Sequence, residues 1–168
     1  MTKRINVLTP KFRVKEVLSE IEDCLEIGWT GMGYKTIEFE KDWSNYTNLK
    51  NSHFISSATA GLHLALRTLS HFGNWNKGDE IITTSLTFVS TNHAILYEDF
   101  KPVFADVDEY LCINPNNLKK LLTPKTRALI FVGLGGNAGK LDKISEFCKS
   151  NNIKLILDAA HMSGTYVK

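Results

Sequence analysis

The sequence predicts an α/β fold, a mostly parallel sheet flanked by helices, and three observations support this prediction. Short apolar runs alternate with helical patterns about five times from His53 onward, which is typical of a parallel sheet wrapped by helices. The run Ala128–Val132 is wholly apolar, as expected of a strand covered on both faces. The chain has 168 residues, the length of one domain or of part of a larger one.

Residues 1–52 are charged and helical in pattern. Apolar residues at i, i+3, i+4 and i+7 form one helix face: Val14, Val17, Leu18 and Ile21. A glycine-rich stretch, Gly28–Gly33, is too flexible to continue that helix. We therefore expect an N-terminal helical segment over 1–52 and a separate domain over 53–168.

The second part alternates strands and helices. The expected strands are 53–56, 80–84, 102–105, 128–132 and 153–157. One expected helix face consists of Leu62, Ala65, Leu66 and Leu69, and another helix covers 87–97. Asn114 as a cap and Pro115 at the first turn predict a further helix start, and the last helix begins near Leu141.

Composition argues against several classes of protein. The 20 basic and 18 acidic side chains give a net charge of +2, which does not suit a nucleic-acid binder. No apolar run approaches the roughly 18 residues of a membrane span, and the N-terminus has no signal-peptide core. The widely spaced Cys24, Cys112 and Cys148 suit the reducing cytoplasm, and the five histidines show no metal-site spacing.

Ligands of parallel α/β sheets bind beyond the carboxyl ends of the strands, so the residues that follow each strand carry the chemistry. Small residues from Ser56 to Gly61 open a helix, whose first amides have no internal partner. This is the pattern of a phosphate site, with the Ser57 and Thr59 hydroxyls as extra donors. The alternative is an ordinary Ser/Thr helix cap.

Three later residues also stand at strand ends. Asp158 follows three apolar residues, and a carboxylate is costly to bury there without a cationic partner, unless it only caps a following helix. Phe88 follows the strand 80–84 and suits either stacking on a planar ligand or a place in the core. His161 suits either a site near Asp158 or a structural role.

A competing motif lies at Gly133–Ala138, where GLGGNA fits the dinucleotide pattern G-x-G-x-x-A after a strand. Asp158 would then be the ribose-binding acid. Two features argue against this alternative. The helical pattern starts only near Leu141, beyond the third small residue, and the motif lies late in the chain rather than opening its domain.

A phosphate site, an aromatic residue and an acid at strand ends suit one planar phosphorylated cation, and pyridoxal phosphate (PLP) is such a ligand. Over essentially its whole length the chain resembles the N-terminal part of the DegT/DnrJ/EryC1/StrS sugar-nucleotide aminotransferases, which have the aspartate-aminotransferase fold. The resemblance rests on the order and spacing of six segments: IGW from Ile27, SSATAGLHLAL from Ser56, GDEIITTSLTFVSTNHAILY from Gly78, KPVFADVD from Lys101, LTPKT from Leu122 and LILDAAHMSGTYVK from Leu155.

The resemblance implies roles for individual residues. Ser57, Ala58 and Thr59 would bind the cofactor phosphate, and Phe88 would lie over the pyridine ring. The carboxylate of Asp158 would pair with the protonated pyridine nitrogen, and His161 would lie near the phenolic oxygen. These six residues are the cofactor site that the resemblance implies.

The resemblance also implies an activity. The family transfers an amino group from glutamate to a keto sugar nucleotide for surface polysaccharide, with PLP or pyridoxamine phosphate (PMP) as cofactor. By this likeness, 1–52 would contain the substrate entrance, including Trp29, and 53–168 would be a partial PLP-binding large domain. We expect a cytoplasmic protein that forms a homo-oligomer or docks onto a complementing chain.

Departures from the family pattern qualify this implication. The Schiff-base lysine of the family would lie beyond Lys168, so we expect no catalytic residue in this chain, and we expect a fragment that is inactive alone. Relatives carry His-x-x-Gly where this chain has Gly133. Two alternatives stay open: a relative that dehydrates keto sugars, with His in place of the lysine, and a non-catalytic binding or remnant module.

Overall fold

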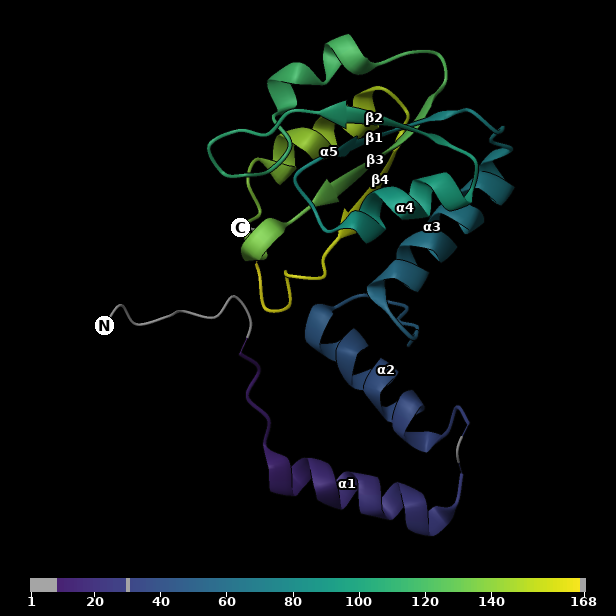
Figure 1. The fold of residues 1–168 in the computed structure, drawn as a ribbon, viewed down its shortest axis with the longest axis vertical. Coiled ribbons are helices and arrows are strands. Elements are labelled where there is room, and N and C mark those ends of the chain that lie inside the picture. The colour runs from purple at the N-terminus through teal and green to yellow at the C-terminus, as the bar shows by residue number, and fades with distance from the viewer. Residues whose placement is uncertain (1–8, 30, 167–168) are drawn as a thin grey trace. The chain divides into compact units, whose positions relative to one another are not determined.

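The computed structural model describes residues 9–29 and 31–166 and divides the chain into two compact units, Met1–Phe54 and Ile55–Lys168. The first unit contains helices α1 (Val14–Ile27) and α2 (Tyr34–Thr47) (Figure 1). Helix α1 ends at Gly28, whose left-handed backbone (φ 70°) lets its amide bond to the carbonyls of Cys24 and Leu25. Whether these units act as the predicted entrance segment and large domain stays a prediction.

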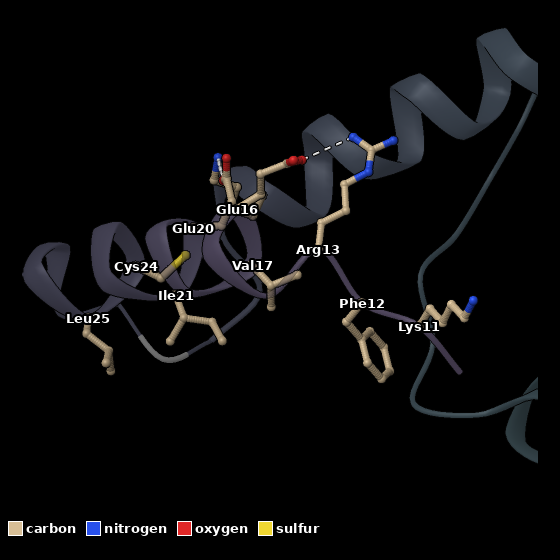
Figure 2. Close-up of a pocket in the computed structure, with 10 residues that line it drawn as sticks. Lys11, Phe12, Arg13, Glu16, Val17, Glu20, Ile21, Cys24 and Leu25 are labelled. Carbon is tan, nitrogen blue, oxygen red and sulfur yellow. Dashed lines mark hydrogen bonds and ion pairs between the residues drawn. The ribbon is translucent and has the colours of Figure 1, made fainter. Parts of the chain in front are cut away.

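The predicted apolar face of α1 borders a groove of about 700 Å³ (Figure 2). Phe12, Val17, Ile21 and Leu25 contribute its apolar lining. Charged residues flank them, and Arg13 forms an exposed ion pair with Glu16 at 3.1 Å. Because Val17 and Ile21 are 44% and 48% exposed, this face is not a core of the first unit.

The second unit contains a parallel sheet of four strands: β1 (Glu80–Thr84), β2 (Lys101–Ala105), β3 (Thr126–Val132) and β4 (Lys154–Asp158). Their order in the sheet is β2-β1-β3-β4. Helices α3 (Ala58–Gly73) and α4 (Val89–Tyr97) cover one face, and α5 (Leu141–Ser150) covers the other (Figure 1). The predicted α/β class with a mostly parallel, helix-flanked sheet is confirmed.

Strand β3 explains why the sheet has two cores. Its side chains alternate between faces, so Leu129 and Phe131 join the α5 side, whereas Ala128 and Ile130 join the α3–α4 side. All four are completely buried. The wholly apolar run that the sequence displays is therefore a central strand between two helical layers.

Two predicted elements are wrong. Residues 53–56 form no strand, and Phe54 is 57% exposed, because no neighbouring strand pairs with them. The helix predicted from Asn114 consists of two short 3-10 turns, η1 (Pro115–Asn117) and η2 (Lys119–Leu121). The Asn114 side chain does accept the predicted cap bond from the Asn116 amide, but the fully buried Leu118 separates the turns.

The path of the chain creates a crevice at one end of the sheet. It crosses from β1 through α4 to β2, then returns to the other side of β1 as β3 and continues through α5 to β4. Successive crossovers therefore leave β1 and β3 in opposite directions, and such a switch point opens a crevice outside the strands' carboxyl ends. Figure 1 shows α3 and α4 beginning at the end of the sheet where β3 and β4 finish.

The described ranges contain neither a helix that could span a membrane nor a side-chain cluster that could bind a metal ion. Between residues 9 and 29 and between 31 and 166, none of the helices combines the length and apolar character needed to cross a membrane. The same residues include no group of three or more His, Cys, Asp or Glu side chains that could hold a metal ion.

We predict that Glu80 stabilises the fold only above acidic pH. Its carboxylate accepts bonds from Thr123 Oγ1 (2.6 Å) and Lys101 Nζ (3.0 Å), and both lower the pKa of Glu80 below its ordinary value. A lowered folded-state pKa gives stability above the unfolded pKa that disappears as pH falls through the folded one. Glu80→Gln should lower the free energy of unfolding by about 1–2 kcal/mol at pH 7.

Denaturant unfolding of both proteins at pH 7 and at pH 3 measures this contribution. The difference between wild type and Glu80→Gln should narrow at pH 3. A difference that is equal or larger at pH 3 would contradict the assigned role of the Glu80 carboxylate.

Candidate functional site

Asp158 is the last residue of β4, at the carboxyl end of the sheet, and it is 8% exposed. Its Oδ2 accepts a hydrogen bond from Thr91 Oγ1 at 2.6 Å, and its Oδ1 accepts one from the Ala160 amide at 3.3 Å. The backbone carbonyl of Asp158 accepts from the Gly133 amide, which follows β3. The carboxylate is therefore fixed between α4 and the loops that follow β3 and β4.

Thr91 belongs to a directed pair of hydroxyl groups at the start of α4. An ionised carboxylate only accepts hydrogen bonds, so the Thr91 hydroxyl is the donor in its bond to Asp158. Its oxygen then accepts from Thr87 Oγ1, which lies 2.8 Å away. Asn92 secures this end of α4 to β1 by accepting from Thr83 Oγ1 and donating to the Thr84 carbonyl.

The protein partners of Asp158 in the described ranges are neutral, so the cationic partner expected for this carboxylate stays a prediction. Among the described residues of the protein, its carboxylate bonds to one hydroxyl and one amide, and no ion pair includes it. A carboxylate offers about four acceptor positions, so capacity remains for a further donor. The alternative of a helix cap does not apply, because turns, not a helix, follow Asp158 up to Tyr166. These contacts fit the positively charged nitrogen of a ligand such as PLP.

His161 lies in the loop after β4 and is exposed. The Gly135 amide, in the loop after β3, donates a hydrogen bond to its ring Nδ1 at 3.2 Å. The two loops meet again where Thr165 Oγ1 donates to the Gly136 carbonyl at 3.0 Å. The structure thus brings His161 and Asp158 into one pair of adjoining loops.

The loop after β3 is also anchored at its far end. Lys140 Nζ lies 3.0 Å from Asp108 Oδ2 and 3.0 Å from Glu109 Oε1, and Asn137 Nδ2 donates to the Tyr110 carbonyl. Burial alone would raise the pKa of Asp108, but the Lys140 ammonium and nearby backbone amides outweigh it, and that pKa is lowered. The loop from Gly133 to Lys140 is therefore held at both ends.

The predicted phosphate residues lie at the first turn of α3. Ser57 is the N-cap, and its Oγ accepts from the Ala60 amide at 3.1 Å. In the described ranges the Ala58 and Thr59 amides have no protein acceptor, as expected for the first helical positions. Helix α3 packs against β4, yet no hydrogen bond in those ranges joins this turn to Asp158.

The remaining predicted residues occupy different places. Phe88 caps α4 next to Thr87 and is 73% exposed, so its alternative assignment to the core is wrong. Trp29 belongs to the first unit, where its indole N–H donates to the Met32 carbonyl at 3.1 Å. Its role at a substrate entrance stays a prediction.

The glycine-rich loop does not have the form of a dinucleotide site. Residues Leu134–Gly136 make a 3-10 turn (η3), and α5 starts only at Leu141, so the third small residue, Ala138, lies before the helix. One of its glycines lies close to a neighbouring side chain. A Cβ added to Gly133 would lie 2.1 Å from Met162 Sδ, so a larger residue there would force the Met162 side chain to move.

Sequence reasoning missed Thr87, Thr91 and Gly135. Thr91 lies in the first turn of α4 and Thr87 lies just before the N-cap Phe88, four residues earlier, so both hydroxyls lie beyond the carboxyl end of β1. That spacing was visible in the sequence, whereas their contact with Asp158, 67 residues later, was not. Gly135 donates through its backbone amide, and the type of a residue does not indicate what its backbone amide contacts.

The DegT/DnrJ/EryC1/StrS aminotransferase family model matches residues 12–168. Among curated proteins, the spore coat polysaccharide biosynthesis protein SpsC of Bacillus subtilis is 37% identical over 155 residues, which are 92% of this chain and 39% of SpsC. The chain spans about two-fifths of the length of the curated relatives it matches.

Solved structures agree. The putative sugar aminotransferase Spr1654 from Streptococcus pneumoniae, in its PMP form, superposes with a TM-score of 0.84 at 28% identity, covering 96% of this chain and 44% of that one. DesI, solved in the presence of its TDP-sugar product, gives a TM-score of 0.81 at 28% identity, over 94% of this chain and 39% of its own. The likeness expected from the sequence is therefore confirmed, and the chain belongs to the DegT/DnrJ/EryC1/StrS aminotransferase family.

Proposed function

We propose that this chain supplies the cofactor-binding part of a PLP-dependent nucleotide-sugar aminotransferase. The observation that carries the proposal is the buried Asp158 carboxylate, which is oriented by Thr91 and lacks a cation of its own in the described structure. Family membership supports it, as do solved relatives in PMP and PLP forms. The TDP-sugar product present with DesI supports a nucleotide sugar as the substrate class.

Asp158 would hold the pyridine nitrogen in its protonated form. When bound, PLP supplies a ring that withdraws electrons from the substrate's Cα–H bond, provided that its nitrogen carries a proton. A carboxylate favours that proton through charge and a charge-assisted hydrogen bond. Thr91 and the Ala160 amide hold the two carboxylate oxygens in place, so Asp158 needs little reorientation when the cofactor binds.

The first turn of α3 would bind the phosphate group. The free amides of Ala58 and Thr59 point along a helix N-terminus, which favours an anion. The Ser57 Oγ already accepts from Ala60, so its hydroxyl proton remains available for a phosphate oxygen. Phe88, exposed at the start of α4, offers an aromatic face for the ring.

The substrates, location and assembly complete the proposal. We expect glutamate as the amino donor, a keto sugar nucleotide as the acceptor and surface polysaccharide as the end use, the last in line with the name of SpsC. The free thiols of Cys24, Cys112 and Cys148 agree with a reducing cytoplasm. The outer strands β2 and β4 expose Phe104 (52%) and Leu157 (45%), which suits an oligomer or a complementing chain.

In this proposal the Schiff-base lysine of the family is not among the lysines of this chain. Lys101 and Lys154 are the first residues of β2 and β4, at the opposite end of the sheet from Asp158. Lys140 is engaged with Asp108 and Glu109. These positions support the expectation that the chain by itself does not transaminate.

We predict that the chain binds PMP and that Asp158 controls the affinity. Asp158→Asn keeps the shape but removes the charge, so titration calorimetry should give an affinity about 10–100-fold lower. Thr91→Val, which leaves Asp158 Oδ2 without its donor, should lower the affinity about tenfold, whereas Thr91→Ser should retain it.

The matched control is Asp142→Asn, an exposed carboxylate in the first turn of α5. It should bind PMP like the wild type. If Asp158→Asn bound PMP as tightly as Asp142→Asn does, the proposed cofactor site would be wrong.

We predict that PLP forms no specific adduct with a lysine of this chain. After incubation with PLP and reduction with borohydride, peptide mass mapping should find only scattered, low-level modification of exposed lysines. Stoichiometric labelling of one lysine would show that the chain contains the covalent amine after all.

We predict that the chain self-associates through its exposed sheet edges. Sedimentation at micromolar concentration should give an average mass above the 18.9 kDa of one chain, and Leu157→Lys should lower it. A monomer at every concentration tested would contradict this prediction.

A further inference from the structure

The loops that follow β3 and β4 are joined by three hydrogen bonds, and we call this pair of loops the clasp. The Gly133 amide donates to the Asp158 carbonyl, the Gly135 amide to His161 Nδ1, and Thr165 Oγ1 to the Gly136 carbonyl. The first and last bonds bracket the His161 contact along both loops. The hydrogen bond to the His161 ring is thus flanked by two further bonds between the same loops.

The backbones of the two loops lie close together in this clasp. Gly135 and Gly136 have positive φ angles of 64° and 83°, a conformation that L side chains rarely adopt. A Cβ on Gly136 would lie 3.1 Å from the His161 carbonyl oxygen. The glycines therefore let the β3 loop approach the His161 backbone and aim the Gly135 amide at the ring.

The direction of the Gly135 bond determines the state of the ring. A backbone N–H can only donate, so His161 Nδ1 must accept and carries no proton. A neutral imidazole then carries its proton on Nε2. We propose that the Gly135 amide fixes His161 as the Nε2–H tautomer, so that its ring acts toward a bound ligand as a hydrogen-bond donor.

This inference rests on the proposed function for the identity of the ligand and specifies how His161 meets it. The group facing His161 must be an acceptor, such as an oxygen that carries negative charge. Gly135 is a positioning residue, because it acts through His161. Glutamine can imitate the arrangement, since its oxygen can accept from the Gly135 amide while its NH₂ donates.

Nuclear magnetic resonance on the ligand-free chain tests the tautomer directly. Long-range ¹H–¹⁵N correlations at about pH 9, where histidines are ordinarily neutral, distinguish Nε2–H from Nδ1–H. His161→Gln assigns the signals by their loss. The exposed His71 serves as a reference for which the described structure gives no ring hydrogen bond. His63, whose Nε2 lies 2.7 Å from Glu98 Oε1, serves as a hydrogen-bonded reference.

We expect His161 to populate the Nε2–H tautomer about tenfold more strongly relative to Nδ1–H than His71 does, as one extra hydrogen bond would produce. An Nδ1–H form, or a mixture equal to that of His71, would overturn the proposal. Thr165→Val, which removes the bond to Gly136, should shift His161 toward the His71 pattern, and Thr165→Ser should not.

PMP titration separates this inference from the proposed function. His161→Gln should bind PMP within about threefold of the wild type, and His161→Phe should bind about tenfold more weakly. Loss of binding in His161→Gln equal to that in His161→Phe would contradict a donor role. If the wild type did not bind PMP at all, the proposed function would fail, while the tautomer measurement would still decide the role of Gly135.

Discussion

The hydrogen bond between Thr91 and Asp158 is the constraint on which the site depends. It joins the start of α4 to the end of β4 across 67 residues of sequence, and it lies in the buried part of the unit. A carboxylate is expensive to remove from water without partners, and the Thr91 hydroxyl and the Ala160 amide offset that cost without neutralising the charge. The result is a fixed negative charge with acceptor capacity to spare, which distinguishes Asp158 from Asp79, paired with Arg127 at 2.7 Å, and from Asp108, paired with Lys140.

The topology of the sheet explains why this charge lies at the same end of the sheet as other candidate residues. With the order β2-β1-β3-β4, the chain reverses direction between β1 and β3, so the loops after these strands diverge and leave a crevice at their carboxyl ends. The loop after β1 supplies Thr87 and Phe88, and the loop after β3 supplies the Gly135 amide. At the end of β4, which pairs with β3, the chain supplies Asp158 and His161. The candidate residues thus lie where parallel α/β sheets generally bind their ligands.

Much of the fold could be predicted because burial leaves a periodic pattern in the sequence. Leu62 and Leu66 lie on one helix face and are buried, and β3 is apolar throughout because both of its faces are covered. The strand at 53–56 was mispredicted because a short apolar run carries no information about whether a partner strand is present. The turns after Asn114 were mistaken for an α-helix because a cap and a proline define where a helical segment begins, not how long it continues.

The sequence alone determined the α/β class, the family, and which residue types stand at the strand ends, because these depend on local pattern and on the order of motifs along the chain. Tertiary structure decided the partners. It gave Asp158 the hydroxyl of Thr91 as a hydrogen-bond donor, exposed Phe88 at the cap of α4, and directed the Gly135 amide toward His161. Such contacts join residues far apart in sequence, and their geometry is set by how strands pair and helices pack, so no local pattern records them.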